Sequence, residues 1–211
     1  MREMDFILCL IADAEAARGR KIPSIIEQAV RGGVNLVQLR AKNLETREFL
    51  ALALEVSKVL EAKKTPLIIN DRVDIAQACG ASGVHLGQED LSLPMARKML
   101  GKKKRIGITV NTLREAQEAE AGGADYLGVG PVFSTLTKKE LRPLLGLPGL
   151  KAIREKVKIP ILAIGGINVS NARQVMECGV DGIAVVAAIM AAKNIRRATK
   201  ELIEAMGCYK R

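Results

Sequence analysis

Four segments of the chain repeat one pattern, in which a glycine after a helical stretch leads into an apolar strand. The segments begin at residues 33, 80, 123 and 179 and read GVNLVQL, GASGVHL, GADYLGV and GVDGIAV. Their intervals of 43 to 56 residues are too long for one strand–helix unit and suit two. Further apolar runs lie between them, at residues 6–11, 66–70, 105–109 and 160–164. The sequence therefore predicts eight strands, each followed by a helix.

Eight such units favour an α/β fold, a (βα)₈ TIM barrel, because equal units turn by equal amounts about an axis. The 211 residues suit one domain of this kind, expected to span residues 1–211. A doubly wound open sheet is the alternative. Helices are expected at residues 47–62, 94–100, 113–121, 147–156 and 170–178, and the repeated glycines are expected to end helices in the left-handed conformation.

The composition bears on the core and on possible partners. Apolar residues make up 48% of the chain and aromatic residues 2%, which suits a parallel sheet of aliphatic strands buried on both faces. The net charge of +10 raises the question of nucleic acid, but the basic residues are scattered and the chain has no Trp. We therefore expect solvated basic loops, no nucleic-acid partner, and a positive field that attracts small anions.

Cysteine usage and hydropathy suggest the compartment. Cys9, Cys79, Cys178 and Cys208 form no CxxC pair and are expected to be reduced packing residues. The apolar run 6–12 is too short to span a membrane, and acidic residues on both sides argue against a signal peptide. The sequence predicts a cytoplasmic protein with no membrane partner. It leaves the oligomeric state open, and a homo-oligomer is compatible with it.

Polar clusters follow three successive predicted strands, where the active site of a barrel lies. They are QLRAK (38–42), Asn70-Asp71 and GQED (87–90). Asp71 and Asp90 offer the carboxylate oxygens that Mg²⁺ prefers, and Arg40 and Lys42 offer cations for phosphate. The clusters together predict a site for a metal-bound diphosphate.

Each cluster also has a purely structural interpretation. Asn70 or Asp71 could cap the following helix, and Arg40 and Lys42 could pair with acidic side chains at 45 and 48. His85, the single histidine, is expected to be packed or hydrogen-bonded rather than catalytic.

A second phosphate site is expected at the long loop after the sixth strand and at the loops after the seventh and eighth strands. The irregular segment 130–150 carries Thr135, Thr137 and Lys138, and long loops in compact domains commonly bind ligands. The loops after the seventh and eighth strands, at 163–168 and 185–189, offer backbone N–H groups and helix N-termini.

These motifs together resemble the thiamine phosphate synthase family, which joins the pyrimidine and thiazole halves of the vitamin. The matching segments, in family order, are QLRAK, INDRVD (69–74), GVHLGQED (83–90), GVGPVFSTLTKK (128–139) and AIGGI (163–167). The resemblance implies a Mg²⁺-dependent transferase. Its substrates would be hydroxymethylpyrimidine diphosphate and hydroxyethylthiazole phosphate or its carboxylate form.

The resemblance also implies a role for each matched residue. The diphosphate would be bound by Arg40, Lys42, Asn70 and Lys138, which with Thr109 form the catalytic set. Mg²⁺ would be held by Asp71 and Asp90. Gln38 and Thr109 would lie beside the pyrimidine. The thiazole phosphate would be held by Thr135, Thr137, Gly166, Val186 and Ala187.

The chain departs from the family pattern at three places. Ala187 stands where the family commonly has Ser, so a hydroxyl is lost beside the thiazole phosphate. Thr109 replaces another Ser but keeps a hydroxyl. After the first strand the chain reads IADAEAARGR rather than the usual ITD, so no role is transferred there.

The implied reaction is a dissociative substitution in which diphosphate leaves before the thiazole nitrogen attacks. It needs no protein nucleophile, which fits the absence of a Cys–His or Ser–His constellation. Two alternatives stay open: a thiazole tautomerase-like relative, which would not need the diphosphate and metal residues, and a non-catalytic, basic RNA-binding module.

Overall fold

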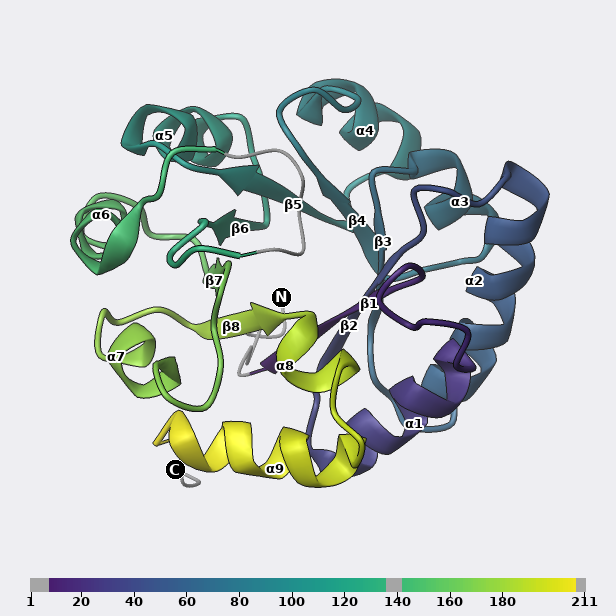
Figure 1. The fold of residues 1–211 in the computed structure, drawn as a ribbon. Helices are drawn as coiled ribbons and strands as arrows, with labels where there is room; N and C mark the ends of the chain where they lie inside the picture. Colours follow the sequence, from purple (N-terminus) through teal and green to yellow (C-terminus); the bar gives the residue numbers. More distant parts are fainter. Residues whose placement is uncertain (1–7, 136–141, 208–211) are drawn as a thin grey trace.

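The strands of the chain close into a parallel barrel. The structure, a computed structural model, describes residues 8–135 and 142–207 (Figure 1). Each strand pairs with its neighbours in sequence, and β8 pairs with β1. The strands are β1 (Leu8–Asp13), β2 (Leu36–Arg40), β3 (Leu67–Asn70), β4 (Gly83–Leu86), β5 (Arg105–Val110), β6 (Tyr126–Val129), β7 (Ile161–Ile164) and β8 (Gly182–Val185). The predicted (βα)₈ barrel is confirmed, and the open-sheet alternative is wrong.

Helices surround the strands, as Figure 1 shows. They are α1 (Ile22–Gly32), α2 (Thr46–Glu61), α3 (Val73–Ala78), α4 (Leu93–Leu100), α5 (Leu113–Ala121), α6 (Gly146–Arg154), α7 (Ala172–Met176), α8 (Ala187–Met190) and α9 (Ile195–Ala205). The predicted helix at 113–121 matches α5, whereas α7 is shorter than the predicted 170–178. The short α8 is inserted between β8 and the outer helix α9.

The repeated glycines end helices as the sequence predicts. Gly33, Gly80, Gly123 and Gly179 have φ angles of 117°, 70°, 86° and 80°. This left-handed conformation costs residues with a Cβ about 1–2 kcal/mol, so glycine is the natural choice. The pattern therefore marks the chain reversals before four of the strands and has a structural role.

Two apolar cores hold the barrel. The larger one lies between the strands and the helices, and the smaller one fills the barrel interior. The interior cluster consists of Cys9, Ile11, Leu36, Ile68, Tyr126, Leu162 and Ala184. Successive residues of a strand face opposite sides, so every second residue points into the barrel. The inward-facing residues at the carboxyl ends of the strands lie on top of this interior cluster. They form the floor of a cavity at that end of the barrel.

The cysteines that the structure describes are free thiols. Cys9 and Cys79 are buried, Cys178 is half-buried, and Cys208 lies outside the described residues. Burial raises the pKa of Cys9 to about 12, so this thiol stays protonated and serves as a packing group. In the part of the chain that the structure covers, we find no helix with the length and apolar character needed to cross a membrane.

Candidate active site

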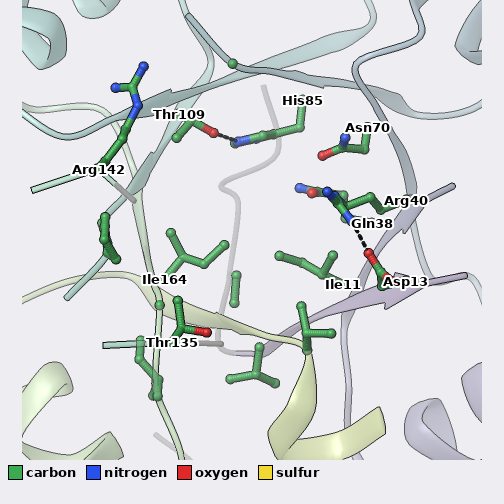
Figure 2. Close-up of a pocket in the computed structure, with 18 of the residues that line it drawn as sticks. Ile11, Asp13, Gln38, Arg40, Asn70, His85, Thr109, Thr135, Arg142 and Ile164 are labelled. Atoms are coloured by element: carbon green, nitrogen blue, oxygen red, sulfur yellow. Dashed lines mark hydrogen bonds and ion pairs between the residues drawn. The ribbon is translucent and has the colours of Figure 1, made fainter. Parts of the chain in front are cut away.

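A cavity of about 390 Å³ opens at the carboxyl ends of the strands. The side chains labelled in Figure 2 converge on it from several strands. The predicted site residues that line it are Gln38, Arg40, Lys42, Asn70, Asp71, Asp90, Thr109, Thr135, Gly166, Val186 and Ala187. The predicted Thr137 and Lys138 lie outside the described residues. The strand-end clusters therefore meet in one place, although they are far apart in sequence.

Arg40, the last residue of β2, is held by a carboxylate from β1. Its Nη1 donates to Asp13, which lies opposite it in the strand register and is almost fully buried. Arg40 Nε is also buried and has no hydrogen-bond partner among the residues that the structure describes. Arg40 also lines the cavity, so a guanidinium held in place by Asp13 presents its cation to an anion there.

The alternative pairing of Arg40 and Lys42 with Glu45 or Glu48 is wrong. Glu45 and Glu48 form the capping box that begins α2. Lys42 points instead to Asp71, with 3.5 Å between Nζ and Oδ2.

Asp71 and Asp90 form a carboxylate pair at the mouth of the cavity. Burial and the neighbouring Asp90 raise the pKa of Asp71 to about 6, while Lys42 acts in the opposite direction. Asp90 is itself oriented by the backbone N–H of Gly87, at 2.6 Å from its Oδ2. Two carboxylates this close repel each other when both are ionised, and a cation between them would remove that repulsion.

The backbone turns Asp71 into this position. Its φ of 64° lies in the left-handed region, which is uncommon for a residue other than glycine. Its N–H donates to the carbonyl of His85 at 2.8 Å, so the turn is tied to β4. The N-cap of α3 is Arg72, so the interpretation of Asn70 or Asp71 as a helix cap is wrong. Strain of this kind is common at functional sites.

The donor set fits Mg²⁺. Among the described residues no group of three or more His, Cys, Asp or Glu side chains could hold a metal. Mg²⁺ does not need such a cage, because it is commonly bound by one or two carboxylates and completes its shell with phosphate oxygens and water. The Asp71–Asp90 pair beside two cations matches this pattern.

The floor of the cavity is polar. Gln38 from β2 and His85 from β4 are buried, and Thr109 from β5 lies beside them. His85 Nε2 lies 2.8 Å from Thr109 Oγ1, and its Nδ1 lies 3.0 Å from the Tyr126 hydroxyl. The expected hydrogen-bonded state of His85 is confirmed, and the ring also faces the cavity.

The β7–β8 side of the cavity is built from backbone and small residues. Gly165 and Gly166 have φ angles of 101° and 64°, and a Cβ on Gly166 would lie 2.5 Å from the carbonyl oxygen of Ser134. Val186 and Ala187 begin the short helix α8, whose first N–H groups have no partner within the helix. Thr135 and Ile164 lie across the cavity from Asn70 and Arg40 (Figure 2).

Three residues near the cavity were missed from the sequence. Asp13 ends β1 just as Arg40 ends β2, and this strand-end position is the signal that could have found it. Tyr126 begins β6 and gave no signal of a site. Arg142 lines the cavity and pairs with Glu115 of α5 at 3.2 Å. That contact joins residues 27 positions apart, and sequence spacing alone does not indicate it.

Comparisons with known proteins fit this geometry. The sequence model of the family described as thiamine monophosphate synthase matches residues 8–189. The chain belongs to this family. Its thiamine-phosphate synthase relatives include one from Clostridium botulinum (strain Kyoto / Type A2), 47% identical over 95% of this chain and 98% of the relative. Another, from Clostridium novyi (strain NT), is 49% identical over 95% and 98% of the two chains.

A solved structure agrees with the family assignment. The thiamine phosphate pyrophosphorylase from Pyrococcus furiosus is 40% identical, with a TM-score of 0.88 over 96% of both chains. The resemblance to the thiamine phosphate synthase family seen in the sequence is therefore confirmed, and so is the prediction of a transferase. The predicted roles of single residues stay predictions.

Proposed function

We propose that this chain makes thiamine phosphate from hydroxymethylpyrimidine diphosphate and hydroxyethylthiazole phosphate or its carboxylate form, with diphosphate as the leaving group and with loss of CO₂ as well when the carboxylate form is used. The observation that carries the proposal is the grouping of Arg40, Lys42, Asp71 and Asp90 on one side of a cavity, in a chain of this family. A diphosphate needs cations and a metal. That side of the cavity offers two cationic side chains and two carboxylates that would hold the metal.

The leaving diphosphate would lie against β2 and β3. Arg40 would donate from the part of its guanidinium that lines the cavity, and its other side would stay fixed by Asp13. Lys42 and Asn70 line the same side, and Lys138 is proposed from the sequence alone to complete the set. These groups stabilise negative charge that grows as the bond breaks, which is the electrostatic part of catalysis.

Asp71 and Asp90 would hold Mg²⁺, which supplies neutralising charge to the diphosphate when it is bound. The carboxyl pair also has a task toward the protein. Because Asp71 contacts Lys42, it keeps the ammonium group at the mouth of the cavity. Asp90 is fixed by Gly87, so the pair is preorganised before any substrate binds.

The two organic halves would occupy the rest of the cavity. The pyrimidine would lie on the floor, between Gln38 and Thr109, and the thiazole phosphate would be bound across the cavity from the diphosphate. Its ligands would be Thr135, Thr137, Gly166, Val186 and Ala187. Backbone N–H groups at a helix start suit a phosphate that keeps its charge throughout the reaction.

The chemistry is a substitution at the methylene carbon of the pyrimidine. The C–O bond to diphosphate breaks first, and its electron pair leaves with the diphosphate. The aminopyrimidine supports the resulting cation until the thiazole nitrogen donates its lone pair to form the C–N bond. The protein contributes orientation and charge, and no side chain acts as a nucleophile.

An assay of both products tests the proposal. The purified protein would be incubated with both substrates and Mg²⁺, with and without a chelator, and thiamine phosphate and diphosphate would be measured together. We expect equal amounts of the two products, lost with the chelator and restored by added Mg²⁺. A folded protein that forms neither product, but isomerises a thiazole without Mg²⁺, would favour the tautomerase-like alternative.

Three properties stay predictions. They are a cytoplasmic location, the absence of a nucleic-acid partner, and the compatibility of the chain with a homo-oligomer. Salt-sensitive RNA binding by the purified protein would contradict the second. Sedimentation of the untagged protein would decide the third.

A further inference from the structure

One exposed arginine joins the loop after β1 to the carboxyl end of α8. Arg20 lies in the loop that leads to α1, and it does not line the cavity. Its guanidinium donates three hydrogen bonds, all to backbone carbonyls. Nε donates to Ala17 at 3.2 Å, Nη1 to Ala192 at 3.3 Å, and Nη2 to Met190. The last two acceptors lie about 170 positions along the chain, and Arg20 has no role in the proposed function.

The helix α8 is too short to keep its direction by itself. It is a single turn, Ala187–Met190, whereas isolated helices shorter than about 12 residues are marginal in water. Figure 1 shows it between the end of β8 and α9. The side chains of Ile189 and Met190 are fully buried, so packing holds one face of the turn. Because apolar packing is not directional, the hydrogen bonds at the ends of the turn must set the direction of its axis.

Arg20 supplies such bonds at the carboxyl end. The last carbonyls of a helix have no partner within it, and they carry a partial negative charge that attracts a cation. The Ala187 carbonyl accepts from the N–H of Ala191 at 3.0 Å, whereas the Met190 carbonyl accepts from Arg20. A cationic fork that bonds one carbonyl in the turn and a second just beyond it fixes the axis at two points.

The loop that carries Arg20 is itself anchored to the barrel. Asp13, the last residue of β1, accepts the N–H of Ala16 at its Oδ1, at 2.9 Å, and the N–H of Ala17 at its carbonyl, at 3.1 Å. The Ala17 carbonyl then accepts from both the backbone N–H and the Nε of Arg20. Arg20 is therefore tied through two short steps to β1, and it connects α8 to a strand of the barrel.

The amino end of the same turn lies in the cavity. Val186, Ala187 and Ala188 line it, and the first two are the proposed ligands of the thiazole phosphate. A backbone N–H binds an oxygen well only when it points at it. A four-residue helix is about 6 Å long, so a change of direction at its carboxyl end also turns its first N–H groups. A misplacement of about 1 Å in a site can have a large cost.

We propose that Arg20 is a positioning residue that holds α8 in the direction in which its first N–H groups meet the thiazole phosphate. The inference rests on the proposed function and extends it to a residue that touches no substrate. Loss of Arg20 weakens the binding of one substrate. The opposite side of the cavity, which carries Arg40 and the carboxylate pair, is unaffected.

The two Michaelis constants separate this role from a general effect on the fold. Arg20→Gln removes the cation and the fork from an exposed position, and urea unfolding shows that the variant is folded. We expect KM for the thiazole phosphate to rise at least ~10-fold, while kcat and KM for hydroxymethylpyrimidine diphosphate stay within about twofold of the parent. Arg20→Lys keeps the charge but has no planar fork, so its KM for the thiazole phosphate should stay at least ~3-fold above that of the parent.

Arg18→Gln is the matched control. Arg18 lies in the same loop, is exposed, and makes no side-chain hydrogen bond or ion pair with residues 8–135 or 142–207. The substitution removes the same charge, so it corrects for the general positive field around the cavity. We expect both of its KM values to equal those of the parent.

Three results would overturn the inference. An unchanged KM for the thiazole phosphate in Arg20→Gln would show that α8 is held without Arg20. An equal rise of both KM values would make Arg20 a general structural residue. A parent-like KM in Arg20→Lys would assign the effect to charge alone. Each of these leaves the proposed function standing, because the parent protein still makes thiamine phosphate, whereas no product from the parent protein would overturn the proposed function itself.

Discussion

The two sides of the cavity hold anions by different means. The side formed by β2, β3 and the segment after β4 carries charged side chains, including Arg40, Lys42, Asp71 and Asp90. The side formed after β7 and β8 carries glycines, small residues and the start of a short helix. On the proposed function, the first side would face a group that gains charge as it leaves, and the second would face a phosphate whose charge stays constant. The difference suggests that the charged side acts on the rate and the backbone side on binding.

The largest effect is expected from Asp71→Asn. The substitution keeps the shape of the side chain, and Asn tolerates the left-handed backbone that Asp71 adopts. It removes one carboxylate of the proposed metal site. We expect kcat to fall by about 1,000-fold, which is the upper end of the loss seen when one electrostatic group is removed from an active site. Steady-state kinetics with saturating Mg²⁺ measure it.

Asp74→Asn is the control for this change, because Asp74 lies on the same segment but is exposed and paired with Arg72. Its kcat should stay within about twofold of the parent, as expected for a surface ion pair. Lys138→Ala is expected to lower turnover to a similar extent, with the fold intact. Near-normal turnover in both Asp71→Asn and Lys138→Ala would contradict the assignment of the diphosphate and the metal to the charged side of the cavity.

A smaller effect, on binding rather than rate, is expected from Gly166→Ala. The new Cβ would lie 2.5 Å from the carbonyl oxygen of Ser134, so the loop must shift away from the phosphate it is proposed to bind. We expect KM for the thiazole phosphate to rise at least ~10-fold, with kcat changed less than threefold.

Gly179→Ala controls for backbone strain. Gly179 has a similar φ of 80°, but its Cβ would meet nothing closer than 3.7 Å, and it lies outside the cavity lining. It should lower stability by about 1 kcal/mol without changing KM. Equal KM values for the thiazole phosphate in Gly166→Ala and Gly179→Ala would contradict the proposal that the backbone side of the cavity binds this phosphate.

The charged side of the cavity should also change how the stability of the protein depends on pH. Burial and Asp90 raise the pKa of Asp71 from 3.8 to about 6 in the folded protein, so the folded state binds this proton more tightly than the unfolded chain. The resulting loss of stability is absent below about pH 4 and complete above about pH 6. We expect Asp71→Asn to gain stability over the parent as the pH rises through this range, measured by urea unfolding without divalent metal. A difference that did not vary with pH would contradict the close carboxylate pair.

The smallest effect is expected from Ala187→Ser, which restores the hydroxyl that the family commonly has at this position. One added hydrogen bond is worth about 0.5–1.5 kcal/mol, so KM for the thiazole phosphate should fall by about 2- to 10-fold. Ala191→Ser, at the exposed end of α8, should change nothing. An unchanged KM in Ala187→Ser would place the phosphate away from α8.

The sequence was a good guide to the strands and a poorer one to contacts across the barrel. The repeated glycines and the apolar runs located all eight strands, because local hydropathy and helix ends determine them. The strand-end position of Asp71 and Asp90 was likewise readable, since parallel strands place their ends together. Their nearness in space needed only the order of the strands.

Contacts that depend on how the barrel closes were not predictable. The meeting of His85 and Tyr126 over Gly107 requires the register of three strands, and a periodic pattern does not specify register. The alternative partners considered for Arg40 lie in its own loop, whereas its partner Asp13 comes from the neighbouring strand. The backbone turn at Asp71 also left no signal, because Asp is common both in turns and at helix starts.

The most direct measurement is a crystal structure of the protein with Mg²⁺, thiamine phosphate and diphosphate bound together. The account predicts diphosphate against Arg40, Lys42 and Asn70, and the metal between Asp71 and Asp90. It places the phosphate of thiamine phosphate at Gly166 and Ala187, with the pyrimidine beside Gln38. Diphosphate on the β7–β8 side, or a metal that touches neither carboxylate, would contradict it.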